Sequence, residues 1–376
     1  MHIRRTLLLL VALTLVAAAC GDSGTTETTA APTATTQGTT DTTDGSTDTT
    51  VDEMGDWPEE IVFGFIPSEQ QEGLQTNIEP FMEALSEKLG ITVTGLVTAD
   101  YTGLVVALGT GQADLGAFGP FGYVQAKDQY DNIEVMIQSI RFGSDLYHGQ
   151  WFTNDPSICD APPVPGALEN EAGSPVLKAP TEVVALQVGW TFGDSGLEPE
   201  VLEDGTAVDP GLACTASLDK VVGKRVAFTS STSTSGAVFP QLQLINAGID
   251  IENDIEYEYV GGHDTAVEAV YSGDFDIGVS FDDARRNLRT ENPDVGSKVI
   301  VFNITDDIPN DVVAANSNLP ESLLDAIYDA IDEYLQTEEG EAVLDEIYGW
   351  TDIRRADEAD FAIIREAAEK LGVTED

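Results

Sequence analysis

Short apolar runs alternate with segments of helical spacing over most of this chain, and that alternation is the strongest constraint on its fold. The run 61–67 is typical of a buried strand, and residues 77–89 place apolar side chains three and four positions apart. The same order recurs as far as residue 140, and again between residues 224 and 304. Such alternation favours a mainly parallel sheet flanked by helices. We therefore predict an α/β fold built from two sets of strands and helices.

The rhythm breaks at 154–216, which is rich in Pro, Gly and acidic residues and contains two cysteines. We interpret this run as an insertion with a short strand of its own at 183–190. From residue 320 to 371 we expect helices, broken near Gly340 and Gly349. The domain boundaries that we predict are lobe 1 (57–150), the insertion (151–218), lobe 2 (219–305), and a return to lobe 1 with C-terminal helices (306–376).

The first 20 residues have the features of a secretion signal. A basic start with Arg4 and Arg5 precedes an apolar core at 7–16, which is too short for an ordinary membrane span. The core ends in three alanines and Cys20, which resembles a bacterial lipoprotein signal. That resemblance implies cleavage before Cys20, a lipid on its side chain, and an extracytoplasmic protein anchored to the membrane. A plain secreted protein with a chance cysteine is the alternative.

Residues 21–56 consist mostly of Thr, Ser, Gly, Asp and Ala. They contain too little apolar surface to offset the entropy lost on ordering. We predict a disordered tether that holds the folded part away from the membrane.

The formal net charge of −50 excludes nucleic acids and anionic membrane surfaces as electrostatic partners. It does not exclude a buried anion site, because solvent screens distant charges within about 10 Å.

The chain has three cysteines. If Cys20 carries a lipid, Cys159 and Cys214 remain as a pair in an oxidising compartment, and a disulfide is the natural interpretation. Two unpaired thiols are the alternative.

Residues 225–240 contain the most suggestive chemistry. A short apolar strand leads into the hydroxyl run 229–234, then Ser235 and Gly236, and then an apolar helix. Hydroxyls and free backbone N–H groups at a helix start, beside a glycine that permits close approach, favour a tetrahedral anion. An ordinary helix cap with surplus hydroxyls is the alternative.

Other polar residues stand at similar joints or in nearby loops, where ligands bind in open α/β sheets. Each taken alone is also explained by packing or capping. We find no Gly-x-Ser-x-Gly elbow, phosphate loop or metal-ligand spacing, and we expect no enzyme activity, cofactor or metal. The residues at these positions are Tyr101, Tyr147, His263, Asp282, Asp283 and Asp311.

Several motifs recur in the order known from one family. They are Asp100-Tyr101, Gly119-Pro-x-x-Tyr123, Ser233-Thr-Ser-Gly236 before Pro240, Gly248-Ile-Asp250, Gly262-His-Asp264 and Ile308-Pro-x-Asp311. Together they resemble the substrate-binding proteins of phosphonate, phosphite and phosphate ABC importers. The resemblance implies the two-lobed type II periplasmic-binding-protein fold, closing about a hinge, with a permease as partner.

The resemblance also implies roles for residues. Ser233, Thr234 and Ser235 would hold the oxyanion, although Ser231-Thr232 extends the run and leaves its register open by two positions. His263, Tyr101 and Tyr147 would complete the cradle, and Asp283 and Asp311 would receive a ligand amine. We expect a monomer that takes up phosphonate, phosphite or phosphate. A secreted enzyme and a ligand-sensing surface protein on the same scaffold are the alternatives.

Overall fold

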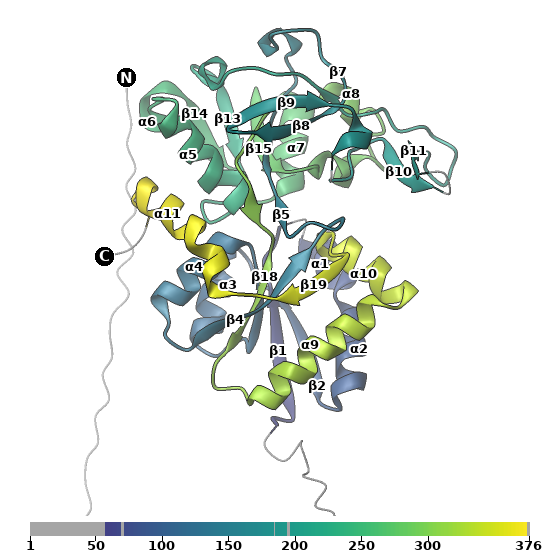
Figure 1. The fold of residues 1–376 in the computed structure, drawn as a ribbon, viewed down its shortest axis with the longest axis vertical. Helices are drawn as coiled ribbons and strands as arrows, with labels where there is room; N and C mark the ends of the chain where they lie inside the picture. The colour runs from purple at the N-terminus through teal and green to yellow at the C-terminus, as the bar shows by residue number, and fades with distance from the viewer. Residues whose placement is uncertain (1–56, 69–70, 184, 194–195, 374–376) are drawn as a thin grey trace, which may run out of the picture. The chain divides into compact units, whose positions relative to one another are not determined.

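The computed structural model describes residues 57–68, 71–183, 185–193 and 196–373. They belong to one structural unit, Asp52–Asp376. The predicted signal, the lipidation site Cys20 and the tether at 21–56 lie outside the described residues. Two large mixed sheets organise this unit (Figure 1).

The first sheet combines strands from both ends of the described chain. In order across the sheet they are β19 (Asp352–Arg355), β4 (Ile133–Ile140), β18 (Val312–Asn316), β3 (Leu115–Phe118), β1 (Glu60–Phe65) and β2 (Thr92–Val97). β1 pairs in parallel with β2 and β3, whereas β18 runs antiparallel between β3 and β4. All five residues of β18 are buried, so this late strand completes the middle of the sheet.

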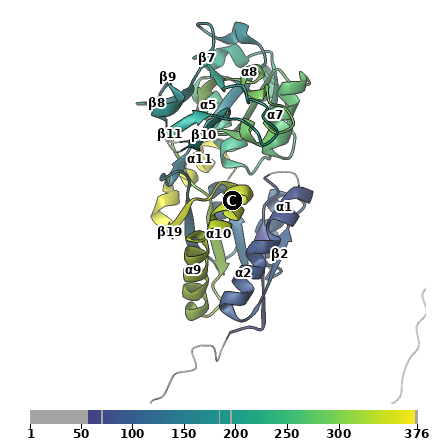
Figure 2. The same ribbon diagram turned by 90° about the vertical axis from the view of Figure 1, so that its right-hand side faces the viewer.

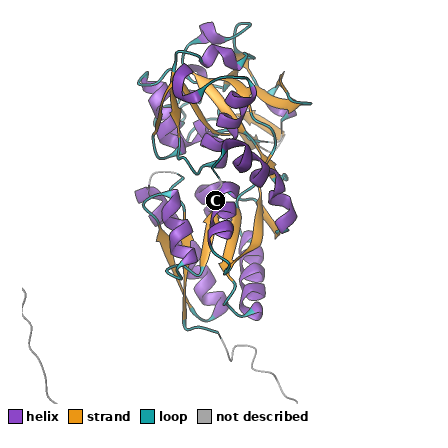
Figure 3. Ribbon diagram, turned by 90° about the vertical axis from the view of Figure 1, so that its left-hand side faces the viewer, coloured by secondary structure: helices purple, strands orange, loops and turns teal. Residues whose placement is uncertain are grey.

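Helices cover both faces of the first sheet (Figures 2 and 3). Alternate residues of β18 enter two separate cores, with Val313 in one and Val312 in the other, because successive strand side chains point to opposite faces. The helices on the Val313 face are α1 (Gln71–Asn77), α2 (Glu79–Leu89), α9 (Glu321–Leu335) and α10 (Glu338–Tyr348). Those on the Val312 face are α3 (Tyr101–Gly109), α4 (Pro120–Gln129) and α11 (Ala362–Leu371).

The second sheet has seven strands. In order they are β14 (Glu256–Tyr259), β13 (Arg225–Phe228), β15 (Ile277–Phe281), β6 (Gly149–Thr153), β16 (Ile300–Ile304), β12 (Leu212–Ala213) and β7 (Val164–Pro165). β6 lies in the interior, antiparallel to both β15 and β16, and all its residues are buried. The predicted insertion at 151–218 therefore includes strands of this sheet, namely residues 151–153 of β6 together with β7 and β12.

Short helices pack around the second sheet and complete two further cores. They are η3 (Leu218–Val221), the π-helical turn η4 (Thr234–Val238), α5 (Phe239–Asn246), α6 (Ile251–Asp254), α7 (His263–Ser272), the 3₁₀ turn η5 (Ala284–Leu288) and α8 (Val295–Lys298). The 3₁₀ turn η5 directly follows Asp282 and Asp283.

The chain passes between the two sheets through residues 141–148 and 305–311, which we call the crossing ribbon. Within it, β5 (Leu146–Tyr147) pairs antiparallel with β17 (Ile308–Pro309). The Asn310 N–H donates to the Asp145 carbonyl at 2.8 Å, and the Thr305 N–H donates to the Gly149 carbonyl at 2.8 Å. Two short, mutually bonded segments of this kind are suited to act as a hinge.

Between β6 and β13 the chain forms hairpins and turns rather than another α/β unit. Among the described residues of the strand predicted at 183–190, only Trp190 lies in a strand, at the start of β10. Besides β7 and β12, the elements are η1 (Pro156–Ile158), the hairpin of β8 (Ala167–Glu171) and β9 (Ser174–Lys178), η2 (Pro180–Glu182), and the hairpin of β10 (Trp190–Gly193) and β11 (Gly196–Pro199).

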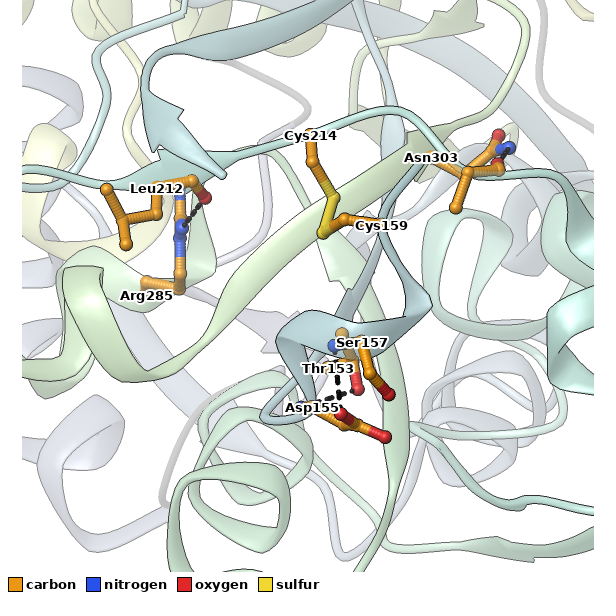
Figure 4. Close-up of a disulfide and its surroundings, with 9 residues drawn as sticks. Thr153, Asp155, Ser157, Cys159, Leu212, Cys214, Arg285 and Asn303 are labelled. Carbon is orange, nitrogen blue, oxygen red and sulfur yellow. Dashed lines mark hydrogen bonds between the residues drawn. A yellow bond between two sulfur atoms is a disulfide. The ribbon is translucent and has the colours of Figure 1, made fainter. Parts of the chain in front are cut away.

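A disulfide joins Cys159 to Cys214, with their Cα atoms 5.7 Å apart, and confirms the predicted pairing (Figure 4). The Cys214 N–H also donates to the Val301 carbonyl of β16 at 2.9 Å. The cross-link spans 55 residues, and closing a loop of that size stabilises by about 4 kcal/mol in the chain-entropy model. It fastens the insertion to the second sheet.

The C-terminal segment follows the prediction in part. The helix predicted to break near Gly340 breaks at 336–337, between α9 and α10, and Gly340 lies in the first turn of α10, where its N–H donates to the Thr337 side chain. After Gly349 the chain forms β19 at the sheet edge, and η6 (Glu358–Phe361) then leads into α11. β19 carries three charged residues around the single buried Ile353, a composition that edge strands tolerate and that hides the strand from pattern analysis.

Candidate ligand-binding cleft

A cavity of about 590 Å³ is lined by residues from both halves of the fold and from the crossing ribbon. Its size is typical of small-molecule sites. All eight residues predicted to contact a ligand line it, namely Tyr101, Tyr147, Ser233, Thr234, Ser235, His263, Asp283 and Asp311.

The hydroxyl run enters the cleft at the joint between β13 and η4. Ser233 caps η4, its Oγ accepting the Gly236 N–H at 3.1 Å, and η4 continues directly into α5. Ser233, Thr234 and Ser235 line the cavity and are almost fully buried, whereas Ser231 is exposed and is not among the lining residues. This placement favours the register in which Ser233 to Ser235 face a ligand.

Gly236 is required for close packing inside the turn. A Cβ at this position would lie 1.9 Å from the Thr229 Oγ1, which is a severe overlap. We predicted that this glycine permits close approach of an anion, and in the structure the group that lies close to it is the Thr229 side chain.

His263 joins the hydroxyl turn to the second sheet from the first turn of α7. Its Nδ1 lies 2.7 Å from the Ser280 Oγ of β15, and its Nε2 lies 3.5 Å from the Ser233 Oγ. Burial, assisted by the positive charge of Arg141, lowers the pKa of His263 to about 3. The imidazole is therefore neutral near pH 7 and carries one N–H donor.

Tyr101 and Tyr147 approach the same turn from the first half of the fold and from the crossing ribbon. Burial raises the pKa of each phenol well above its ordinary value, and the negative charge of Asp311 adds to the effect. The neighbouring Ser233 opposes the shift in Tyr101, and Ser235 opposes it in Tyr147. Both phenols keep their protons and can donate hydrogen bonds. We call Ser233, Thr234, Ser235, Tyr101, Tyr147 and His263 the donor cradle.

One hydrogen bond crosses between the halves beside the cradle. The Phe121 N–H of α4 donates to the Thr234 Oγ1 at 2.9 Å. A Cβ on Gly119, just before α4, would lie 3.6 Å from that oxygen and 3.9 Å from the Asp311 Oδ1. Thr234, the start of α4 and Asp311 therefore lie close together.

Asp311 has a partner within the chain that sequence analysis missed. Its carboxylate accepts a hydrogen bond from the Arg141 guanidinium, and the side chains are only 15% and 14% exposed, respectively. The Arg141 Cζ lies 5.4 Å from the Tyr147 ring centroid and 5.7 Å from that of Phe281. Burial raises the pKa of Asp311, although the Arg141 charge opposes the shift.

Asp283 is also paired within the chain. Its carboxylate accepts from the Arg285 Nε at 2.8 Å, from the Arg285 Nη2 at 2.9 Å and from the Val188 N–H at 3.0 Å. Burial raises the pKa of Asp283, but Arg285 and the backbone donors outweigh burial and lower it overall. Asp283, which we predicted to receive a ligand amine, is therefore part of a buried ion pair that contacts Val188.

Among the residues that the structure describes, several buried donors at the cleft have no hydrogen-bond partner. They are the Ser68 Oγ, the Arg141 Nε and the Arg286 Nε. Leaving buried donors unsatisfied costs free energy, so their convergence on one cavity points to an anionic ligand that accepts from them.

Comparison with known proteins agrees with this geometry. Residues 63–361 match the family model described as ABC transporter, phosphonate, periplasmic substrate-binding protein. The chain belongs to this family. Its members are the substrate-binding components of transporters, so at the family level the function is binding and the setting is extracytoplasmic.

Two relatives of this phosphonate-family binding protein match it over most of their length. It is 25% identical over 280 residues to the phosphate-import protein PhnD of Mycolicibacterium smegmatis, covering 72% of this chain and 70% of the relative. It is 24% identical over 306 residues to the phosphonates-binding periplasmic protein of Escherichia coli, covering 81% of this chain and 75% of the relative.

Solved structures confirm the predicted fold of this binding protein. PhnD1 from Prochlorococcus marinus, in complex with methylphosphonate, matches with a TM-score of 0.64 and 21% identity over 84% of this chain and 99% of that one. A binding protein of an ABC phosphonate transporter from Pseudomonas aeruginosa gives 0.62 and 19% over 83% and 86%. The two-lobed type II periplasmic-binding-protein fold is therefore established for this chain.

The described part of this binding protein contains no cluster of three His, Cys, Asp or Glu residues arranged to hold a metal ion. Within the same residues, each helix is too short or too polar to span a bilayer.

The functional candidates that sequence analysis missed are Ser68, Arg141, Ser280 and Arg286. Three of them occupy positions that the sequence could have flagged. Ser68 follows the first strand closely, Arg141 directly follows β4, and Ser280 is the penultimate residue of β15. The rule that ligands bind at the carboxyl ends of strands therefore also applies to Ser68, Arg141 and Ser280.

Proposed function

We propose that this protein captures a phosphonate, phosphite or phosphate oxyanion in the cleft and delivers it to the permease of an ABC importer. The observation that carries the proposal is the donor cradle, a group of buried, uncharged hydrogen-bond donors converging on one cavity. Membership of the phosphonate-binding family supports the ligand class.

Neutral donors suit reversible capture of a tetrahedral anion. The serine and threonine hydroxyls, the protonated phenols of Tyr101 and Tyr147, and the neutral His263 can all donate to phosphorus-bound oxygens without bringing their own counter-ions. The positive end of the continuous η4–α5 helix adds a favourable dipole. Because the cradle is buried, each hydrogen bond is stronger than it would be in water.

The acidic composition of the chain does not prevent anion binding in this site. Exposed carboxylates are screened beyond about 10 Å. Arg286 lines the cavity itself and supplies local positive charge.

Closure about the crossing ribbon would complete the site. The hydrogen bond from the Phe121 N–H to the Thr234 Oγ1 joins the two halves beside the cradle. Movement of one half about 141–148 and 305–311 would open this contact, admit the ligand and then exclude water from it.

Membrane attachment through Cys20 would keep the protein beside its permease, with 21–56 as the tether. We expect Cys20→Ser to move the protein from the membrane fraction into the medium or the soluble fraction. Unchanged membrane association of that variant would contradict the anchor and would leave ligand binding untouched.

Titration calorimetry of the mature protein tests ligand capture. The ligands are phosphate, phosphite and methylphosphonate, with acetate as a planar, carboxylate control. We expect saturable one-to-one binding of at least one phosphorus oxyanion and none of acetate. If none of the three binds, the proposed function is wrong.

Delivery has its own test. Uptake of the ligand that binds should fall when this chain is deleted and return when it is restored. Uptake that does not depend on the chain would contradict delivery to an importer.

A further inference from the structure

Three carboxylates that line the cleft are each paired with a cation of the same chain. Asp311 pairs with Arg141, and Asp283 pairs with Arg285. Asp282 accepts from the His148 N–H at 3.0 Å and lies 3.4 Å from its Nδ1.

The cation beside Asp282 is charged near neutral pH. Burial lowers the pKa of His148, but hydrogen bonds and charges from Asp282 and Asp307 outweigh burial and raise it to about 9. Each of the three carboxylates therefore has a cation of the same chain beside it, although Asp282 shares His148 with Asp307.

The Asp311–Arg141 pair is the one that faces the donor cradle. Asp311 lies near Thr234 through the shared neighbour Gly119, and its charge acts on both Tyr101 and Tyr147. Arg141 lies against the Tyr147 ring. A ligand held in the cradle would therefore direct its remaining substituent toward an ion pair, not toward a free carboxylate.

A ligand ammonium group at Asp311 would lie beside this guanidinium, which already holds the Asp311 Oδ2. The aromatic rings of Tyr147 and Phe281 hold Arg141 in place, and both members of the pair are largely buried. Displacing one partner of a buried ion pair leaves the other charge uncompensated, which is strongly unfavourable. The pair thus resists the binding of a second cation.

Four other acidic residues of the cleft are exposed, so that solvent screens their charges. They are Glu268, Glu291, Asp345 and Glu346. Asp264 is buried in the first turn of α7, where the helix dipole compensates part of its charge.

We propose that Arg141 is a built-in counter-ion that sets the substrate class, so that the cleft takes phosphorus oxyanions with a neutral fourth substituent and discriminates against aminoalkylphosphonates. The fourth substituent would be a hydroxyl, a hydrogen or a short alkyl group. This inference rests on the proposed function and narrows it. Arg141 acts here through Asp311, as a specificity-determining residue.

A matched pair of ligands tests the inference. Propylphosphonate and 2-aminoethylphosphonate have the same heavy-atom skeleton and differ in a terminal methyl against a terminal ammonium. Calorimetry on the mature protein should show propylphosphonate binding at least tenfold more tightly. Equal affinity, or tighter binding of the amine, would overturn the inference.

The variant Arg141→Met removes the counter-ion while keeping much of the side-chain volume. It should shift the affinity ratio toward 2-aminoethylphosphonate by at least tenfold, because Asp311 then lacks its internal cation. Arg355→Met is the matched control, since Arg355 pairs with Asp325 at the surface, outside the cleft, and its loss should leave the ratio unchanged. An unchanged ratio in Arg141→Met would refute the role of Arg141.

Asp311→Asn provides a second variant if Arg141→Met does not fold. It should change the affinities for both ligands by similar factors, whereas a loss confined to the amine would show that Asp311 receives the ammonium in the wild type and would overturn the inference. Titrations with phosphate and methylphosphonate distinguish failure of the proposed function from failure of the inference about Arg141. If neither of these nor propylphosphonate binds, the proposed function fails; if they bind but the amine binds as tightly, only the present inference fails.

Discussion

The donor cradle and the Arg141–Asp311 pair face the same cavity but treat charge in opposite ways. The cradle presents protonated phenols, hydroxyls and a neutral imidazole, and so it leaves an anion to supply the charge. The ion pair contains both charges already. The difference suggests two separate roles. Neutral donors bind the oxyanion, and carboxylates that are paired with a cation determine which fourth substituent the ligand can have.

We expect the largest effect on ligand affinity from substitutions in the donor cradle. Ser233→Ala combined with Ser235→Ala removes two donors, and each lost bond to a charged oxygen costs roughly 1.5–3 kcal/mol. We expect affinity for the phosphorus oxyanion to fall by about a hundredfold or more, measured by calorimetry. Ser231→Ala is the control in the same loop, because Ser231 is exposed and does not line the cavity.

Unchanged affinity in the double variant would remove the cradle assignment. Because the Ser233 Oγ also accepts the Gly236 N–H, thermal unfolding should accompany the titration. The single variant Ser235→Ala serves if the double variant unfolds, and it should still lose about tenfold or more.

The second prediction concerns the contribution of the buried Asp283–Arg285 pair to stability. Arg285→Met leaves the fully buried Asp283 carboxylate without its cation, and should destabilise the fold by about 3–5 kcal/mol in urea unfolding. Arg355→Met breaks an ion pair whose side chains are more than half exposed, and should cost less than about 1 kcal/mol. Similar losses in the two variants would show that burial of the Asp283–Arg285 pair has no special weight.

The third prediction concerns the uncharged state of the cradle. The folded pKa of His263 is about 3, so between pH 6.5 and 3 the unfolded chain gains a proton that the folded chain refuses, and stability falls with pH. Relative to the wild type, His263→Asn should lose about 2 kcal/mol less stability when pH is lowered from 7 to 4.5. The two proteins should be compared by urea unfolding at both values.

Parallel pH profiles for wild type and His263→Asn would mean that this imidazole titrates normally in the fold.

His148 should affect stability in the opposite direction, at alkaline pH. Its folded pKa is about 9, so its contribution is fully present below pH 6.5 and is lost as pH rises through 9. His148→Asn should therefore flatten the alkaline side of the profile.

Local sequence patterns were sufficient to predict the strand–helix joints that carry the cradle. The strand ending at Phe228, the hydroxyl run and the following apolar helix are contiguous, so their chemistry and geometry are encoded together. The two αβ sets and the disulfide were predictable for similar reasons, since they follow from periodicity and cysteine count.

Ion pairing was not predictable in the same way. Arg141 and Asp311 are 170 residues apart, and the antiparallel pairing of β4 with β18 and of β5 with β17 brings them together. The sequence shows Asp283 as one of two adjacent acids, and the choice of Arg285 as its partner depends on the buried geometry of η5. Strand placement failed where composition was ambiguous, at β6 inside the assumed insertion and at the charged β19.

The most direct test of the central claim is a crystal structure of the protein with methylphosphonate bound. We predict that the phosphonate oxygens lie within hydrogen-bond distance, about 2.7–3.2 Å, of the side chains of Ser233, Thr234 or Ser235 and of His263, with Arg141 still paired to Asp311. A ligand bound outside this cradle, or contacting Ser231 and Thr232 in its place, would contradict the account.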